Sequence, residues 1–408
     1  MPKGFFFLIL AQFASGLADN ALMILGVYFL QEQGYPPWWA PLLKFSFTLS
    51  YVFLASVVGP LADAFPKNRV MAAMNALKLV GVILLVSGAH PLLAFALTGL
   101  AAALYAPAKY GWVCESVTPR FLVKANAWLE VSVVLSVMLG VALGGAMIHA
   151  YTSPALQHVM PVIGSEFHMG VSTQILGAFA VVAAVYGISA LFNMGIGTIK
   201  VQAAQRLTLS AMRWSTFWRH NRQLWSDPLG GMSLYVTTLC WGVGAVLQFA
   251  VLVWAQTNAG LTLQQGAYLQ AVVALGVMGG AAMAASTCQI FDARRALPWG
   301  LVLAVLLPCM ALTKVLWLAV IMLLLAGWAG GMLLVPMNAL LQHRGAKIMK
   351  SGRSIAVQGF NENLSVLIML GIYSALLAWD VSLLPIMLLF SLPLLAALKP
   401  WKALRWKN

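Results

Sequence analysis

The stretch Gly59-Pro60-Leu61-Ala62-Asp63-Ala64-Phe65-Pro66-Lys67-Asn68-Arg69 connects two long apolar runs, at about residues 40–62 and 70–89. Three of its side chains, Asp63, Lys67 and Arg69, are charged. Each flanking run is close to the ~20 apolar residues that a helix needs to cross the hydrocarbon core of a bilayer. A short charged connection between two such runs is typical of a turn at the membrane surface, so the stretch indicates a pair of transmembrane helices.

Over the whole chain of 408 residues, 62% of the side chains are hydrophobic and only 8% are charged. Soluble globular proteins carry roughly 25% charged residues, so this composition excludes a soluble enzyme and a disordered protein. The mean hydropathy of +0.88 agrees with this. Together with the two runs above, the remaining apolar runs predict an all-α integral membrane protein with twelve transmembrane helices; they lie at about 4–30, 91–113, 125–151, 173–198, 229–257, 264–290, 297–312, 316–341, 354–378 and 382–399.

The net charge of +14 is concentrated in alternate loops. All but four of the 24 Lys and Arg residues lie in one set of loops and in the two termini, and the other set holds Lys314 alone. The remaining three, Lys44, Lys78 and Lys109, fall within apolar runs. By the positive-inside rule, the basic loops and both termini are predicted to be cytoplasmic. Because the basic residues form no continuous stripe, we expect no nucleic-acid partner.

The longest basic loop divides the chain into two sets of six runs. It predicts an N-terminal six-helix bundle at 1–198, a cytoplasmic basic linker at 199–228 and a C-terminal six-helix bundle at 229–408. The Arg and Trp content of the linker favours an amphipathic segment on the anionic inner leaflet. The two halves also carry similar local patterns: Pro107 and Lys109 in one run correspond to Pro336 and Asn338 in another. Such repetition is typical of transporters built from duplicated six-helix halves.

Ionisable residues inside the membrane are candidates for function because burying their charge in lipid is costly. Asp19 lies in the middle of the first run and is followed by Asn20. It is predicted either to pair with Lys78 or Lys109 or to hold a cation or head group. Glu362 lies in a polar stretch with Gln358, and side chains at this helical spacing must face protein or water.

Lys109 closely follows Pro107, whose ring removes a backbone hydrogen bond and can bend or break a helix. A lysine near such a break is suited to hold a phosphate group. Its other interpretation is snorkelling, in which the amine reaches the cytoplasmic interface. The residues alone leave both readings open.

Two glycine pairs, Gly140/Gly144 and Gly276/Gly280, have the spacing that lets helices approach closely, so we expect them to serve packing. The four cysteines are scattered and form no ligand pattern, so no metal site is expected. Neither the HxxxxD pair of glycerolipid acyltransferases nor a Walker motif is present. No cofactor and no catalysis are therefore predicted.

The stretch quoted at the start resembles the signature loop of the major facilitator superfamily. In that superfamily an aspartate and the basic residues after it form a charge network that latches the cytoplasmic face. The resemblance implies a conformational latch at Gly59, Asp63, Lys67 and Arg69. The corresponding region of the second half, around Asp292, is degenerate.

Further stretches resemble the bacterial lysophospholipid transporter family within that superfamily. They lie in matching order from the first to the eleventh span; they are Ala11-Gln12-Phe13 with Asp19-Asn20-Ala21-Leu22, Pro107-Ala108-Lys109-Tyr110-Gly111, Lys124-Ala125-Asn126, Val335-Pro336-Met337-Asn338-Ala339-Leu340-Leu341-Gln342, and Ala356-Val357-Gln358 with Glu362-Asn363.

This resemblance implies transport of lysophospholipids from the outer to the inner leaflet of the bacterial inner membrane. It also implies a functional partner, the acyltransferase/acyl-carrier-protein synthetase that re-acylates them. One departure is Gln248, which stands where an arginine is expected in the seventh span. The transport path is expected to be lined by Asp19, Asn20, Lys109, Gln248, Asn338, Gln358 and Glu362.

Three other functions remain open at this point. The superfamily loop alone is compatible with a proton-coupled efflux carrier for amphipathic drugs. A membrane-embedded lipid acyltransferase is a second alternative, against which the missing HxxxxD pair counts. A non-transporting scaffold for the acyltransferase is a third. We expect a monomer, because the fold needs no partner to complete its pathway; the coupling ion and the head-group preference are not readable from the residues.

Overall fold

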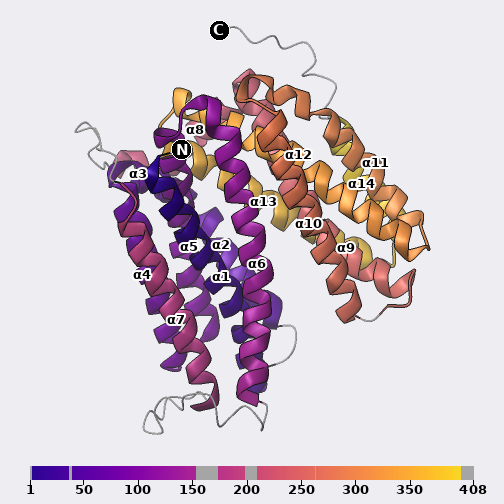
Figure 1. Ribbon diagram of the computed structural model, residues 1–408, viewed down its shortest axis with the longest axis horizontal. Coiled ribbons are helices and arrows are strands. Elements are labelled where there is room, and N and C mark those ends of the chain that lie inside the picture. The colour runs from indigo at the N-terminus through magenta and orange to yellow at the C-terminus, as the bar shows by residue number, and fades with distance from the viewer. Residues whose placement is uncertain (1, 36–38, 153–172, 198–208, 262, 397–408) are drawn as a thin grey trace. The chain divides into compact units, whose positions relative to one another are not determined.

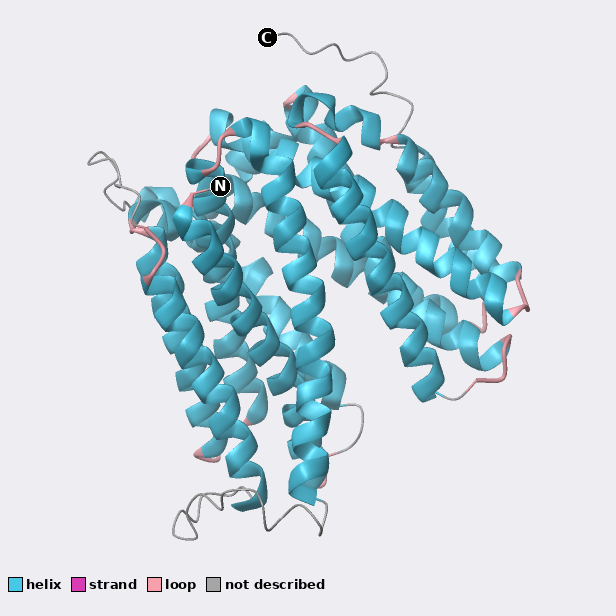
Figure 2. Ribbon diagram, in the orientation of Figure 1, coloured by secondary structure: helices cyan, strands magenta, loops and turns pink. Residues whose placement is uncertain are grey.

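The computed structural model describes residues 2–35, 39–152, 173–197, 209–261 and 263–396 (Figure 1). Within these ranges the regular structure consists of helices (Figure 2). The α-helices are α1 (Lys3–Glu32), α2 (Trp39–Phe53), α3 (Ala55–Ala64), α4 (Lys67–Val86), α5 (Pro91–Ser116), α6 (Leu122–Thr152), α7 (Thr173–Met194), α8 (Trp214–Ser226), α9 (Pro228–Thr257), α10 (Leu263–Thr287), α11 (Pro298–Leu312), α12 (Leu316–Ile348), α13 (Ser351–Ala378) and α14 (Leu383–Ala396). Short 3-10 turns lie at Pro119–Phe121, Leu209–Met212 and Ile290–Ala296.

The helices match the apolar runs in order. Among the described residues, ten helical segments are long and apolar enough to cross a membrane. The pair α2 and α3 together forms a bent span, and α14 is a shorter apolar helix. Every one of the predicted runs therefore contains an apolar helix, and the prediction of an all-α multi-pass membrane protein is confirmed.

The second span differs from the sequence prediction, which treated residues 40–62 as one continuous run. The helix axis turns by 66° between Leu42–Phe53 and Ala55–Ala64. Leu54, between the two pieces, has φ −95° and ψ 3°, outside the helical region. An apolar pattern reports where a chain is buried in lipid, and a change of direction at one residue leaves that pattern unaltered.

The chain forms two compact units. Unit 1 comprises Met1–Ser116 and Leu135–Thr216, and unit 2 comprises Val117–Val134 and Phe217–Asn408. The first part of α6 thus belongs to unit 2 and the rest of it to unit 1. The division into 1–198, 199–228 and 229–408 stays a prediction, and residues 198–208 of the linker lie outside the described residues.

Each unit has its own apolar core. In unit 1, α4 packs against α5 and α7, and α1 packs against α7; these helices run alongside one another in Figure 1. Phe29 and Phe179 meet edge to face in its core, with ring centroids 6.2 Å apart. In unit 2 the buried Trp254 ring lies in the core, and its indole N–H donates to the Thr313 carbonyl at 3.0 Å.

A seam of small residues joins α10 to α12 in unit 2. A Cβ added at Gly276 or Gly280 would overlap the Leu324 or Trp328 carbonyl of α12, and one at Gly327 would overlap the Val273 carbonyl of α10. In unit 1, a Cβ at Gly140 would lie 2.6 Å from the Leu17 carbonyl of α1, and at Gly144 another would lie 2.8 Å from the Ile24 Cβ. The glycine pairs therefore serve close backbone packing, as predicted.

The amphipathic helix α8 packs its apolar face on unit 2. Phe217 and Leu224 are buried, and the Phe217 ring meets the Phe360 ring of α13 with centroids 5.1 Å apart. The exposed face carries Trp218 and, on the same helix, arginines. This arrangement agrees with the predicted amphipathic segment, and its contact with an anionic leaflet stays a prediction.

Asp227 begins the helix after α8. Its carboxylate accepts the Gly230 N–H at 2.7 Å, which caps α9, and forms an ion pair of 2.6 Å with Arg344 of α12. Burial raises the pKa of the Asp227 carboxyl, but the hydrogen bonds from Arg344 and Gly230 outweigh it and hold this pKa below its usual value. A side chain outside the apolar runs thus connects two spans of unit 2.

The glycine seam generates a prediction about stability. Gly280→Ala is expected to lower the thermal unfolding midpoint of the detergent-solubilised protein, because overpacking a close helix contact costs ~1–3 kcal/mol. Gly330→Ala is the matched control, since a Cβ there would meet no atom within 4 Å. The control should be neutral or slightly stabilising. Equal midpoints for the two variants would contradict this account of the seam.

Candidate functional site

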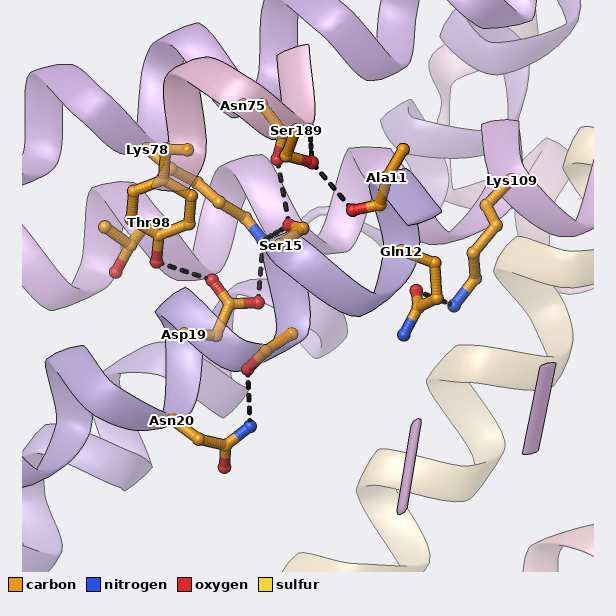
Figure 3. Close-up of polar contacts among 12 residues, drawn as sticks. Ala11, Gln12, Ser15, Asp19, Asn20, Asn75, Lys78, Thr98, Lys109 and Ser189 are labelled. Atoms are coloured by element: carbon orange, nitrogen blue, oxygen red, sulfur yellow. Dashed lines mark hydrogen bonds and ion pairs between the residues drawn. The ribbon is translucent and has the colours of Figure 1, made fainter. Parts of the chain in front are cut away.

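The centre of unit 1 is a buried lysine on α4. The Lys78 side chain is only 2% exposed, and its Nζ forms an ion pair of 2.7 Å with Asp19 Oδ2 of α1. The same Nζ donates to Ser15 Oγ at 2.9 Å, one helical turn before Asp19. Two aromatic rings, Tyr105 of α5 and Tyr186 of α7, also lie near this amine. Their centroids are 5.5 and 5.6 Å from Nζ. Several helices thus converge on one ammonium group (Figure 3).

A chain of hydrogen bonds leads away from Lys78. Ser15 Oγ donates to Asn75 Oδ1 at 2.8 Å, Asn75 Nδ2 donates to Ser189 Oγ at 2.7 Å, and Ser189 Oγ donates to the Ala11 carbonyl at 2.7 Å (Figure 3). Asn75 and Ser189 are fully buried. Each hydroxyl in this chain accepts one bond and donates one, so the network is internally satisfied. Such satisfaction is what a polar group in a hydrocarbon environment requires.

Asp19 is placed with Lys78 and not with Lys109. Its second oxygen, Oδ1, accepts the Tyr186 hydroxyl at 2.7 Å. The carboxylate side chain is 21% exposed, so it is the accessible end of the network. Asn20, next in sequence, donates to the carbonyl of Gly16 in its own helix at 2.8 Å. The structure shows the ion pair with Lys78 that was one of the two predictions for Asp19. The other, a role in holding a cation or head group, stays a prediction.

Lys109 forms a second polar contact of unit 1, apart from the first (Figure 3). Its side chain is buried, and Nζ donates to Gln12 Oε1 of α1 at 2.7 Å. Nζ also lies 4.3 Å from the centroid of the Tyr110 ring. The amine therefore points into the bundle toward an amide. α5 continues through Pro107 without a break, contrary to the broken helix that was considered from the sequence.

In unit 2, Gln358 and Glu362 of the predicted polar stretch form a cluster with Asn338. Gln358 Nε2 of α13 donates to Glu362 Oε1 at 2.8 Å and to Asn338 Oδ1 of α12 at 2.9 Å. The structure thus brings three of the predicted residues together. Within the part of the chain that the structure describes, no cationic side chain forms an ion pair with Glu362.

A reciprocal pair of amides lies elsewhere in unit 2. Asn126 Nδ2 donates to Gln342 Oε1 at 2.9 Å, and Gln342 Nε2 donates to Asn126 Oδ1 at 2.8 Å. Both side chains are buried. The pair joins the first turns of α6 to α12, so it accounts in part for why residues 117–134 belong to unit 2.

Gln248, which replaces the expected arginine, is exposed on α9. Its backbone carbonyl accepts the side chain of Gln270 of α10 at 2.9 Å. No contact of its own side chain with the Glu362 cluster is present among the described residues. Among the described residues, the structure thus gives Gln248 a contact with Gln270 and no hydrogen bond to Glu362, Gln358 or Asn338.

The predicted latch residues lie around the junction of α3 and α4. Gly59 and Asp63 are buried in α3, and Arg69 is exposed on α4. Lys67, at the start of α4, forms an ion pair of 2.8 Å with Glu115 of α5. Glu115 was not singled out from the sequence, although a carboxylate near the basic end of a span is a partner of the expected kind. The latching role stays a prediction.

Sequence reasoning also missed the partners in the Lys78 network. Ser15, Asn75 and Ser189 are uncharged, and single polar residues in apolar helices are too common to mark a site. The available signal was periodicity: Asn68, Asn75 and Lys78 lie on one face of α4, and Tyr186 and Ser189 on one face of α7. Polar residues that recur on one face of a membrane helix indicate a buried polar contact.

Comparison with known families accounts for this architecture. The sequence model of the Major Facilitator Superfamily matches residues 8–369. The chain belongs to the major facilitator superfamily. Members of this superfamily are transporters with nested helical repeats, so the chain is a transporter and not an acyltransferase.

Several curated relatives cover most of this superfamily member. The lysophospholipid transporter LplT of Shigella flexneri is 36% identical over 385 residues, 94% of this chain and 91% of the relative. Proteins of the same name from Yersinia enterocolitica and from an Enterobacter species are 34% identical over 375 residues and 35% identical over 373 residues. These two alignments cover 92% and 91% of this chain and 87% and 88% of the relatives.

Solved structures of the major facilitator superfamily share the fold at low identity. The transporter FucP in the outward conformation has a TM-score of 0.74 at 15% identity, covering 97% of this chain and 98% of that one. The human organic anion transporter MFSD10 has a TM-score of 0.73 at 14% identity, with 97% and 99% covered. At these identities the likeness shows the fold alone.

The Lys78 network generates a prediction. Asn75→Leu keeps the branched shape and the number of heavy side-chain atoms but leaves Ser15 without an acceptor and Ser189 without a donor. Each buried unsatisfied group costs ~1–3 kcal/mol, so the unfolding midpoint should fall clearly. Asn363→Leu is the control, because the Asn363 amide donates to the Gly359 carbonyl of its own helix and, among the described residues, to no other helix. An Asn75→Leu protein as stable as the control would show that the network contributes little.

Proposed function

We propose that the chain is a lysophospholipid transporter of the bacterial inner membrane, with both termini in the cytoplasm. The observation that carries this proposal is identity of 34–36% to curated lysophospholipid transporters over more than nine-tenths of the chain. The substrate moves from the outer to the inner leaflet, where an acyltransferase/acyl-carrier-protein synthetase re-acylates it. The protein acts as a monomer by alternating access, with Gly59, Asp63, Lys67 and Arg69 as a cytoplasmic latch.

The chemistry of the substrate fits the polar groups of each unit. A lysophospholipid has one acyl chain and a polar head, and the head is the part that resists crossing hydrocarbon. In unit 1, the Lys109 ammonium and the Gln12 amide, 2.7 Å apart, offer donors to a phosphate group. Lysine binds phosphate as a point charge without a fixed geometry. We assign phosphate recognition to Lys109, because Gln248 is neutral where the resemblance leads us to expect an arginine.

The positive end of a zwitterionic head group requires a carboxylate. Asp19 already has the Lys78 ammonium at 2.7 Å. Glu362 accepts a hydrogen bond from the neutral Gln358 amide, and no ion pair to it is present among the described residues. We therefore assign the ethanolamine ammonium to Glu362, with Gln358 and Asn338 holding the carboxylate in place.

Leaflet transfer in proteoliposomes tests the proposed function. Labelled lysophosphatidylethanolamine is added outside, and its protection from albumin extraction is followed with time. A diacyl phospholipid and a cationic drug are run beside it. Protection of the lysolipid alone is the expected result. Accumulation of the drug without protection of the lysolipid would replace the proposal by an efflux carrier.

Lys109→Ala is expected to reduce lysophospholipid transfer by roughly tenfold to a hundredfold, because a hydrogen bond to a charged group contributes ~1.5–3 kcal/mol. Lys109→Arg should retain part of the activity because it keeps the charge. Lys314→Ala, outside the spans, is the control for the loss of one positive charge. An unchanged transfer rate in a normally folded Lys109→Ala protein would remove Lys109 from phosphate recognition.

The assignment of Glu362 predicts a change in head-group selectivity. Glu362→Gln should weaken transfer of lysophosphatidylethanolamine by about tenfold or more, since a charge-assisted bond to the ammonium is lost. Transfer of lysophosphatidylglycerol, whose head has hydroxyls and no ammonium, should change little. The two substrates measured on one preparation control for folding. Equal losses for both would argue against this role of Glu362.

A further inference from the structure

We propose that Lys78 is a built-in counter-ion: its ammonium group occupies a monovalent-cation site formed on α1 by Asp19 and Ser15. Neither Na⁺ nor a proton then takes this place during transport. The inference concerns the Asp19 site alone and does not depend on which substrate the protein carries.

The geometry is that of a cation in an oxygen site. Asp19 Oδ2 and Ser15 Oγ, from successive turns of α1, lie 2.7 and 2.9 Å from Lys78 Nζ. Tyr186 donates to the other carboxylate oxygen at 2.7 Å and so holds the carboxylate in orientation. Aromatic faces, which attract cations, lie at 5.5 and 5.6 Å. These are the groups that would hold a small free cation if Lys78 were absent.

The lysine reaches this site from another helix. It belongs to α4, and its side chain is 2% exposed, whereas the Asp19 side chain is 21% exposed. A carboxylate with partial access to solvent in a membrane protein is a site where an ion could bind from outside. Here the charge that it needs is supplied by the chain itself.

Within the described ranges of the chain, Lys78 is the one cationic side chain that forms an ion pair with Asp19. α7 contributes the Tyr186 phenol and α5 the Tyr105 ring, and a phenol carries no positive charge. α2 contributes Lys44, which forms no ion pair with Asp19 among the described residues, and the phenol Tyr51. α6 approaches α1 at Gly140 and Gly144, where its sequence is uncharged.

A free cation at Asp19 would therefore sit beside the Lys78 ammonium. Two positive charges bound to the same carboxylate repel each other strongly where water is scarce. Protonation of Asp19 would leave the buried ammonium without its anion, which is equally unfavourable. The site is thus closed to ions while Lys78 is in place, and removal of Lys78 should open it.

The first experiment measures ion binding without substrate. Thermal unfolding of the purified full-length protein is compared in NaCl and in choline chloride at ~0.15 M, and at about pH 8 and about pH 6. The natural protein should show no Na⁺-specific shift that depends on Asp19. Lys78→Met should be stabilised by NaCl over choline chloride, or by the lower pH, by ~1–3 °C. The double variant Asp19→Asn/Lys78→Met should lose both responses.

Lys78→Arg is the matched control, since it keeps the resident charge and should acquire neither response. A folded Lys78→Met protein with neither response would overturn the proposal, as would Na⁺ stabilisation of the natural protein that Asp19→Asn abolishes. If Lys78→Met does not fold, binding of ²²Na⁺ to the natural protein and to Asp19→Asn decides the matter. Equal binding to the two supports the resident counter-ion, and loss of binding in Asp19→Asn refutes it.

A transport measurement separates this inference from the proposed function. In proteoliposomes that transfer lysophosphatidylethanolamine, Lys78→Met should make the rate depend on Na⁺ or on pH, and Lys78→Arg should not. Glu362→Gln is added to the Lys78→Met background, so that a pH response through Glu362 is recognised. Absence of lysophospholipid transfer in the natural protein would refute the proposed function and leave the ion-binding result intact.

Discussion

The ion pair between Asp19 and Lys78 is the interaction on which the interior of unit 1 depends. A charged side chain in hydrocarbon must find its partner within the protein, because neither lipid nor bulk water supplies one. Lys78 meets this requirement with a carboxylate and a hydroxyl from one helix, and the positions of α1, α4 and α7 follow from it. Once the ammonium is placed, the orientations of Ser15 and Asn75 are determined by which atoms can accept.

Two kinds of contact hold the helices together, and both occur in each unit. In unit 1, side-chain hydrogen bonds cross between α1, α4 and α7 in the interior of the helix bundle. In unit 2, α10 and α12 approach through glycines that bring backbone against backbone. These close glycine contacts are stabilised by dispersion and require no hydrogen-bond partner or counter-ion. The polar groups of unit 2 are thereby left for clusters such as Glu362 with Gln358.

The sequence was sufficient to predict the fold and only part of the site. Twelve apolar runs and the charge asymmetry between loops are long-range patterns, which survive local irregularity. The bend at Leu54 and the continuity of α5 through Pro107 depend on single backbone torsions and on packing, so no pattern reports them. For the site, the cost of burying charge identified Asp19, Lys109 and Glu362. The same argument did not distinguish Lys78 from Lys109 as the partner of Asp19, because the partner depends on how α4 packs against α1 in three dimensions.

The hydrogen-bond chain from Lys78 to the Ala11 carbonyl has a direction. Every donor in it points away from the ammonium: Lys78 to Ser15, Ser15 to Asn75, Asn75 to Ser189 and Ser189 to Ala11. One end is a group that can only donate and the other is a group that can only accept, so the order cannot be reversed. Proton conduction along a hydrogen-bond chain requires that each group can reverse its donor and acceptor roles after a proton has passed, so that the next proton can follow. A hydrogen-bond chain fixed at both ends in this way cannot conduct protons, so this chain provides no proton pathway through unit 1.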